Sequence, residues 1–253
     1  MAVPSYFPFR KVSSEPKKVR LLLFPFAGGS AVAYRGWEEV FPSSVDVCAF
    51  ELRGRGTRLD ETPLREMEAM LLDVEAALVG LPPLPLVIFG HSMGGRIGFQ
   101  FALHLINARS SSLAAHRLIH FFGSASRPPH CALTKKRSHL PKAEFLAELR
   151  EMGGTPEEVL ANPEIMSLFE PMLRADFALA ENVFEKAVLP VPVTSLWGHR
   201  DSAFAQAAAR QWEECTSSAY RLVDLPGGHF FITDPWCRRE VQNIVSETLK
   251  QAL

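Results

Sequence analysis

A serine lies at the centre of the motif Gly-His-Ser-Met-Gly, which covers residues 90–94. The apolar segment 86–89 precedes this motif, and apolar residues at helical spacing follow it as far as Leu105. A strand, a tight turn with serine at its apex and a helix are the context that exposes a nucleophilic serine. Because the chain crosses itself closely at so sharp a turn, the flanking glycines avoid a β-carbon clash. The motif therefore predicts that Ser92 is a nucleophile for acyl transfer, rather than a polar residue in a glycine-rich turn.

A serine hydroxyl is a weak nucleophile, which needs a base to accept its proton and an acid to orient that base. The sequence has eight histidines, and His229 directly follows a β-favouring segment and a Pro-Gly-Gly turn near the C-terminus. We predict that His229 is the base. His91 lies inside the serine motif, where its side chain should point away from the hydroxyl, so we interpret it as structural. His199 is the alternative base, but no strand-end acid follows it.

The acid should lie between the serine and the base along the chain and should follow a strand. Asp201 meets both conditions, because it follows the predicted strand 193–197. The loop after the preceding strand, Gly-Ser-Ala-Ser, contains no carboxylate. Three other aspartates fail on position or order: Asp176, Asp224 and Asp234. We therefore predict Asp201 as the acid.

A tetrahedral intermediate needs backbone N–H donors for its oxyanion. Met93 directly follows the predicted nucleophile, so its N–H should be one donor. The other should come from a loop after an early strand, and residues 26–29, Phe-Ala-Gly-Gly, are small enough for close approach. We assign Ala27, with Phe26 as the neighbouring alternative and a simple glycine turn as the competing interpretation. No dinucleotide, Walker or His-Glu-x-x-His pattern occurs, so we predict neither a cofactor nor a metal.

The elements that must position these residues alternate between strands and helices. Continuous apolar, β-favouring segments indicate parallel strands buried on both faces, and they cover residues 19–24, 45–52, 86–89, 118–122, 193–197 and 220–225. Helical patterns begin after Ser30 and Ser92 and cover residues 63–78, about 203–213 and 235–252. This alternation predicts an α/β fold with a mostly parallel, doubly wound sheet. Ligands bind such sheets at the carboxyl ends of the strands, where every predicted site loop lies.

Residues 135–187 interrupt the alternation, because they contain only helical patterns. The segment is inserted between two strands, at the edge of the sheet where the site loops collect. We therefore predict that it is a helical lid, with an ordinary packing subdomain as the alternative. Pro171 is expected to kink or restart the last helix of this segment. Residues 1–253 should form a single domain that carries the lid.

The composition is typical of a soluble globular enzyme, with 47% hydrophobic and 22% charged residues. The net charge of −1 gives no field that favours nucleic acid or an acidic membrane. The cysteines have no Cys-x-x-Cys spacing, which argues against zinc and a disulfide framework and fits a reducing compartment. We find no secretory signal and no apolar segment near the ~18 residues of a membrane span. We expect a cytoplasmic protein and, because no dimerisation element is evident, a monomer.

Four motifs together resemble the stand-alone type II thioesterases that accompany non-ribosomal peptide and polyketide synthases. They are Phe-Pro-Phe-Ala-Gly-Gly-Ser at 24–30, Gly-His-Ser-Met-Gly at 90–94, Leu-Arg-Ala-Asp-Phe at 173–177 and Gly-Gly-His-Phe-Phe at 227–231. The resemblance covers nearly the whole chain, and the combination is far more specific than the serine motif alone. Arg53 departs from it, because the family usually has proline before Gly-Arg at this position.

The resemblance implies an α/β-hydrolase fold, a triad of Ser92, His229 and Asp201, and oxyanion amides at Ala27 and Met93. It also implies hydrolysis of acyl thioesters on the phosphopantetheine arm of acyl or peptidyl carrier proteins, which edits stalled or misprimed synthases. Two alternatives are a carboxylesterase or lipase that acts on small oxygen esters, and a non-catalytic module that binds carrier proteins.

Overall fold

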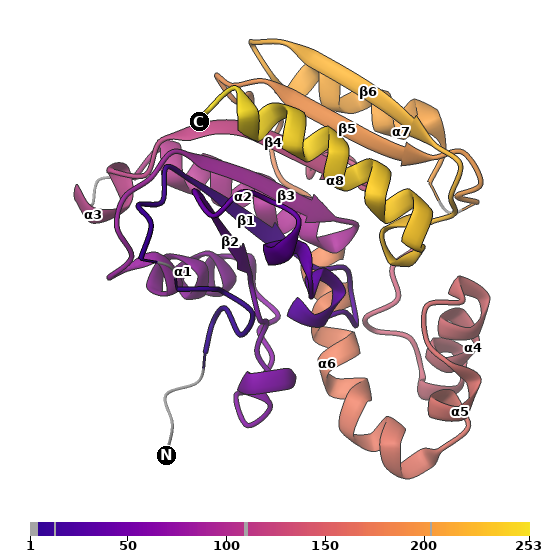
Figure 1. The fold of residues 1–253 in the computed structure, drawn as a ribbon. Helices are drawn as coiled ribbons and strands as arrows, with labels where there is room; N and C mark the ends of the chain where they lie inside the picture. The colour runs from indigo at the N-terminus through magenta and orange to yellow at the C-terminus, as the bar shows by residue number, and fades with distance from the viewer. Residues whose placement is uncertain (1–4, 13, 109–110, 203) are drawn as a thin grey trace.

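The computed structural model describes residues 5–12, 14–108, 111–202 and 204–253 (Figure 1). Six strands form one sheet in the order β2-β1-β3-β4-β5-β6, and each strand is parallel to its neighbours. The strands are β1 (Val19–Phe24), β2 (Val45–Ala49), β3 (Leu86–His91), β4 (Leu118–Ser124), β5 (Val193–Gly198) and β6 (Tyr220–Leu225). After β2 the chain crosses to the other side of β1, where β3 pairs with β1, and the remaining strands are added outward from β3. The order therefore reverses between β1 and β3, which is where open parallel sheets bind ligands.

The predicted strands agree with the observed ones, apart from their ends. β2 ends three residues earlier than expected, because its pairing with β1 stops after the N–H of Phe50 bonds to the carbonyl oxygen of Leu23. The next N–H, that of Glu51, bonds to Tyr6 instead. β3, β4 and β5 continue one or two residues beyond the predicted ends, and the loops after β3 and β5 hold predicted site residues.

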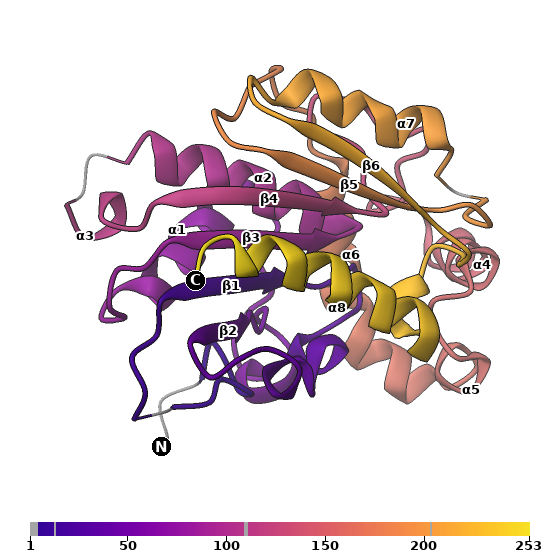
Figure 2. The same ribbon diagram turned by 45° about the horizontal axis from the view of Figure 1, so that its top comes forward.

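Helices cover both faces of the sheet, as the alternating pattern requires. In Figure 2, α8 (Pro235–Lys250) lies in front of the sheet, while α1 (Met67–Leu78) and α2 (Met93–Ile106) lie behind it. Because successive side chains of a strand point to opposite faces, each strand contributes to two cores. In β1, Leu22 and Phe24 pack in the core with α1 and α2, whereas Leu21 and Leu23 pack in the core with α8.

Several expected helices are shorter or tighter than their patterns suggest. Ser30 accepts a bond from the N–H of Val32, but it caps a 3₁₀ turn, Ala31–Tyr34, and a second 3₁₀ turn covers Trp37–Glu39. The first four residues of the predicted helix 63–78 lie outside α1. The helix expected over 203–213 is α7 (Gln206–Arg210) followed by a 3₁₀ turn, and residue 203 lies outside the described residues. A short helix, α3 (Ser111–Ala114), precedes β4.

The helical insertion, residues 135–187, lies between β4 and β5 at the carboxyl ends of the strands (Figure 2). It contains α4 (Lys142–Met152), α5 (Glu157–Leu160) and α6 (Pro163–Glu181). These helices enclose a small core of their own, formed by Phe145, Leu149, Leu160, Met166, Met172, Leu173 and Phe177. Pro171 neither ends nor restarts α6, since the helix runs through it and buries residues on both sides of it.

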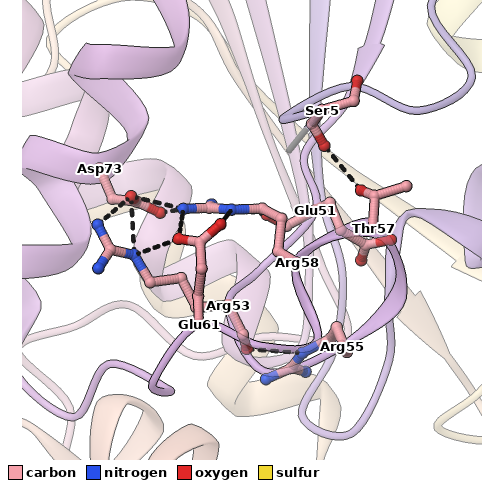
Figure 3. Close-up of polar contacts among 8 residues, drawn as sticks. All are labelled: Ser5, Glu51, Arg53, Arg55, Thr57, Arg58, Glu61 and Asp73. Carbon is pink, nitrogen blue, oxygen red and sulfur yellow. Dashed lines mark hydrogen bonds and ion pairs between the residues drawn. The ribbon is translucent and has the colours of Figure 1, made fainter. Parts of the chain in front are cut away.

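A buried ion-pair network lies beside α1 (Figure 3). The guanidinium of Arg58 bonds to both carboxylate oxygens of Asp73, at 2.7 and 2.8 Å, and also pairs with Glu61. Arg53, the residue that departs from the family pattern, donates to Asp73 at 2.6 Å. Burial alone would raise the pKa of Asp73, but the bonds from Arg58 and Arg53 bring it below its usual value. Arg53 is therefore accommodated in this network.

Among the described residues, no helix is long and apolar enough to cross a membrane.

Candidate active site

Ser92 lies at the turn between β3 and α2, with φ of 55° and ψ of −117°. A non-glycine residue with positive φ is strained, so the surrounding structure must hold it. The N–H of Ser92 donates to the carbonyl oxygen of Ser124 at 2.7 Å, which ties the turn to the end of β4. A β-carbon on Gly90 would collide with the backbone of Gly94, and one on Gly94 would collide with the backbone of Phe24. The sharp turn therefore needs glycine at both positions, as predicted, because a side chain at either one would collide with neighbouring backbone.

The structure brings the three predicted triad residues together. The Nε2 atom of His229 lies 2.9 Å from the Oγ of Ser92, and its Nδ1 lies 2.6 Å from the Oδ2 of Asp201. These residues follow β3, β5 and β6, at the same edge of the sheet. The side chain of Asp201 is fully buried. Because a carboxylate accepts from Nδ1–H, Nε2 is free to accept a proton from the serine hydroxyl.

The alternative base and acid lie elsewhere. The Nδ1 atom of His199 is 3.3 Å from the Oδ1 of Asp224, and both side chains are about half exposed. They form a surface pair that is separate from the triad contacts. Asp234 caps α8, accepting from the N–H groups of Trp236 and Cys237.

His91 is fully buried and contacts the backbone of the predicted base. Its Nε2 lies 2.8 Å from the carbonyl oxygen of His229, and its Nδ1 lies 2.9 Å from the Oγ of Ser124. A carbonyl oxygen only accepts, so Nε2 carries the proton and Nδ1 accepts from the serine hydroxyl. Burial, together with the nearby His229, lowers the pKa of His91 to about 3, which keeps the ring neutral. His91 thus points away from Ser92, as expected, but it also positions the loop that bears His229.

The two predicted oxyanion donors lie on the same cavity as Ser92 and His229. Ala27 and Met93 both line this cavity, whose volume is about 380 Å³. Met93 is the first residue of α2, so its N–H has no acceptor within the helix. Its position directly after the serine places the N–H at the turn. Ala27 approaches the cavity from the loop that follows β1.

A buried ion pair holds the loop after β1 and joins it to the helical insertion. Arg55 donates to both carboxylate oxygens of Asp176, at 2.7 and 2.6 Å, and to the carbonyl oxygen of Gly29 at 2.8 Å. Asp176 also accepts the N–H of Gly28 at 2.7 Å. The loop is therefore held directly after Ala27, through the N–H of Gly28 and the carbonyl oxygen of Gly29.

Neither Arg55 nor Asp176 is among the site residues predicted from the sequence. The available signal is that Asp176 lies three residues after Leu173 and three before Leu179, on the apolar face of a helix. A carboxylate at such a position needs a buried partner, because an unpaired buried charge is costly.

A second cavity, of about 170 Å³, lies between the insertion and the loop after β1. Most of its wall is apolar and comes from α4, α5 and α6, with Ala27 and Phe230 contributing from the sheet side. Ala27, Met152 and Phe177 line both cavities. The cavity at Ser92 therefore adjoins an apolar one that the insertion forms. Across the described residues, no group of three or more His, Cys, Asp or Glu side chains is placed to hold a metal ion.

Comparisons with known proteins agree on one family. Residues 19–249 match the model of the thioesterase domain. The gramicidin S biosynthesis protein GrsT of Aneurinibacillus migulanus is 34% identical over 218 residues, which cover 85% of this chain and 83% of GrsT.

Comparisons with solved structures agree with this family. ClbQ, from the colibactin pathway of non-ribosomal peptide and polyketide synthases (NRPS/PKS), aligns with a TM-score of 0.82 and 28% identity, covering 93% of this chain and 98% of ClbQ. YbtT, a type II thioesterase from the yersiniabactin NRPS/PKS pathway, aligns with a TM-score of 0.78 and 25% identity, covering 95% and 94% of the two chains. The chain therefore belongs to the thioesterase domain family and is a thioester hydrolase, whose homologues include type II thioesterases of NRPS/PKS pathways.

Proposed function

We propose that this protein hydrolyses acyl groups from the phosphopantetheine thioesters of carrier proteins, through Ser92, His229 and Asp201. The observation that carries the proposal is the hydrogen-bonded row from Asp201 through His229 to Ser92, which opens on a cavity lined by Ala27 and Met93. The NRPS/PKS pathways named for ClbQ and YbtT support carrier-bound thioesters as the substrate class. Removal of acyl groups from such carriers would edit stalled or misprimed synthases.

In the first half-reaction, the Oγ of Ser92 attacks the thioester carbonyl carbon while its proton passes to Nε2 of His229. Asp201 holds the ring through Nδ1–H and stabilises the imidazolium that forms. The carbonyl oxygen becomes an oxyanion, which the N–H groups of Ala27 and Met93 stabilise. When the carbon–sulfur bond breaks, His229 returns its proton to the leaving sulfur. The products are an acyl-serine and a free pantetheine thiol.

In the second half-reaction, water replaces the thiol. His229 takes a proton from the water as its oxygen attacks the acyl-serine carbonyl. The same two N–H groups stabilise the second oxyanion. Collapse of this intermediate breaks the bond to Oγ, and His229 returns the proton to Ser92. The carboxylic acid leaves and the enzyme is restored.

The apolar cavity formed by the insertion supports a place for the acyl chain. It adjoins the cavity at Ser92 through Ala27, Met152 and Phe177, so an acyl group bound there could reach the serine. We infer that residues 135–187 act as a lid on a single domain, and that Asp176 and Arg55 anchor the lid at its root. Closure over the acyl chain would exclude bulk water during the first half-reaction.

The proposed function is tested with octanoyl carrier protein and a matched oxygen ester, in which oxygen replaces the pantetheine sulfur. We expect faster release of octanoate from the thioester, and loss of release by at least ~10³-fold in Ser92→Ala. A preference for the oxygen ester would contradict the proposal and favour a carboxylesterase. A fluorophosphonate probe should label the wild-type protein but not Ser92→Ala. Absence of labelling in folded wild-type protein would instead favour a non-catalytic carrier-binding module.

A further inference from the structure

The cavity at Ser92 has an uneven distribution of charge. Three arginines line it, Arg96, Arg127 and Arg137, and neither aspartate nor glutamate is among its lining residues in the described part of the chain. A neutral thioester and an apolar acyl chain do not require a positively charged cavity wall. The charges of these arginines therefore need an explanation beyond the triad chemistry.

Arg137 already has a carboxylate partner. Its Nε donates to the Oε2 of Glu148 at 2.9 Å, and Lys135 pairs with the other oxygen of the same carboxylate. Arg137 thus belongs to a local ion-pair cluster at the start of the insertion. Glu148 therefore offsets part of the charge of Arg137, which it shares with Lys135.

Arg96 is a buried cation held by backbone carbonyls. It is 2% exposed, and its guanidinium donates to the carbonyl oxygens of Pro128, Pro129 and Cys131, at 3.0 to 3.1 Å, and to that of Asn182. Its Nε is buried and has no hydrogen-bond partner in the described structure. These bonds fix the loop that follows β4. Burial lowers the pKa of Arg96 to about 10, and the like charge of Arg127 adds to this effect.

Arg127 begins that fixed loop and is the cation best placed to meet a ligand. It is half-buried, its guanidinium carbon lies 6.0 Å from the ring centre of Phe204, and Phe204 also lines the cavity. It forms no ion pair with any carboxylate among the described residues, and neither does Arg96, which lines the same cavity. Two adjacent like charges without a counter-charge favour an anion beside them.

We propose that Arg127, supported by Arg96, forms a subsite for an oxyanion group of the substrate at the mouth of the Ser92 cavity. Two parts of a carrier-bound thioester carry such a group: the phosphate of the phosphopantetheine arm, and a carboxylate on the acyl group itself. An arginine guanidinium matches both, since its planar donors fit phosphate and carboxylate oxygens. The inference rests on the proposed function, because it assigns a part of that substrate to a side chain outside the triad.

The test compares four small thioesters in wild-type protein and in Arg127→Gln. Acetyl-pantetheine has neither anion, acetyl-phosphopantetheine has the phosphate, malonyl-pantetheine has the carboxylate, and malonyl-phosphopantetheine has both. Loss of a charge-assisted contact should raise KM about tenfold or more for the anionic probe that uses the subsite. The KM for acetyl-pantetheine and kcat for all four should stay within about twofold. Raised ionic strength should reduce the wild-type preference, since salt screens an exposed contact.

The control is Arg117→Gln, which removes the same charge from an exposed position just before β4, at the opposite end of that strand. It should change none of the four KM values. Arg127→Lys should retain part of the preference, which separates lost charge from lost packing. A KM effect confined to phosphate assigns the pantetheine arm, one confined to malonyl assigns the acyl carboxylate, and an effect on both assigns a shared site. Equal effects on neutral and anionic thioesters, or no effect at all, would overturn the proposal.

The failure of this subsite is distinguishable from failure of the proposed function. If the wild-type protein hydrolyses no thioester, the proposed function fails, and the subsite is then tested on p-nitrophenyl acetate. Phosphopantetheine, malonyl-pantetheine or both should inhibit that hydrolysis competitively in wild-type protein, and at least tenfold more weakly in Arg127→Gln. If each of the two compounds inhibits both proteins equally, the subsite is rejected.

Discussion

The carboxylate of Asp176 accepts the backbone N–H of Gly28 at 2.7 Å, so a residue of α6 holds the loop that bears the predicted oxyanion donor Ala27. The same carboxylate pairs with Arg55, which donates to the carbonyl oxygen of Gly29. Insertion and loop therefore share one buried charge pair. Changes to that pair should affect both stability and turnover.

Replacement of Asp176 by alanine should lower the free energy of unfolding by about 3–5 kcal/mol, because Arg55 is left buried and unpaired. The double variant Arg55→Met with Asp176→Leu should recover most of that stability, since an apolar pair removes the unpaired charge. It should not recover kcat, because the bonds to Gly28 and Gly29 are lost. Urea unfolding and thioester turnover measure the two effects. Asp60→Asn, at an exposed position, is the control, and full recovery of kcat in the double variant would show that the loop needs no such support.

Asp201→Asn should lower kcat by about 10⁴-fold, because the amide no longer fixes the tautomer of His229 or stabilises its cation. The fold should be retained, since asparagine has nearly the same shape. Steady-state kinetics and circular dichroism test the two statements. Near-normal turnover would show that the acid is misassigned. Asp224→Asn is the matched comparison, and we expect it to be almost silent, because Asp224 pairs with His199 on the surface.

Phe169 lines the apolar cavity of the insertion and is 46% exposed, so it can be truncated without opening the core. Phe169→Ala should raise KM for octanoyl thioesters about three- to tenfold and leave acetyl thioesters unchanged, because only the longer chain loses apolar contact. Its neighbour Leu168 is 78% exposed and does not line the cavity, so Leu168→Ala is the control. Equal effects on both chain lengths would place the acyl group elsewhere.

Stability should fall on mild acidification, because two histidines are held neutral in the folded protein. Burial lowers the pKa of His120 to about 4 and, as described above, that of His91 to about 3. The unfolded chain binds these protons below pH ~6.5, whereas the folded protein does not, so stability is lost as the pH falls from 6.5 toward 4. His120 alone should contribute a loss of about 2 kcal/mol by pH 5.

The measurement is urea unfolding at pH 7.5 and pH 5. His120→Gln keeps a polar partner for Thr194, whose hydroxyl lies 2.9 Å from the Nε2 of His120, and should lose about 2 kcal/mol less than wild-type protein between the two pH values. His139→Gln, at an exposed position, should behave as wild type. An identical loss in His120→Gln would show that this histidine does not contribute to acid sensitivity.

The sheet and the alternation of its elements could be predicted because each strand is a continuous apolar segment that ends in a distinctive loop. The order of serine, acid and histidine along the chain restricted the choice to Ser92, Asp201 and His229, and the structure places these three residues in one hydrogen-bonded row. The partner of Asp176 could not be predicted, because Arg55 lies 121 residues away along the chain and meets it only after folding. The strand-like pattern of 45–52 likewise gave no sign that Glu51 would pair with Tyr6 rather than with β1.

Pro171 shows another limit of local patterns. Proline in a helix interior removes one hydrogen bond and disturbs the preceding turn, which is why a kink or a restart of the helix was expected. Here Met166, Met172 and Leu173 are buried within the insertion, and α6 continues through Pro171. Tertiary packing outweighs the local preference, and packing is not visible in the sequence window around the proline.

The hydrogen bond from His91 to the backbone of His229 gives the serine motif a second structural role. Residue 91 is bonded covalently to Ser92 and holds the backbone of His229 through one hydrogen bond. Any movement of the β6 loop that carries His229 must therefore either break that bond or carry the turn with it. Two neighbouring residues of one short motif, His91 and Ser92, thus help to set the distance between the predicted nucleophile and the predicted base, although Ser92 and His229 lie 137 positions apart. A relative with a different residue at position 91 would need another contact to hold the distance between these two loops.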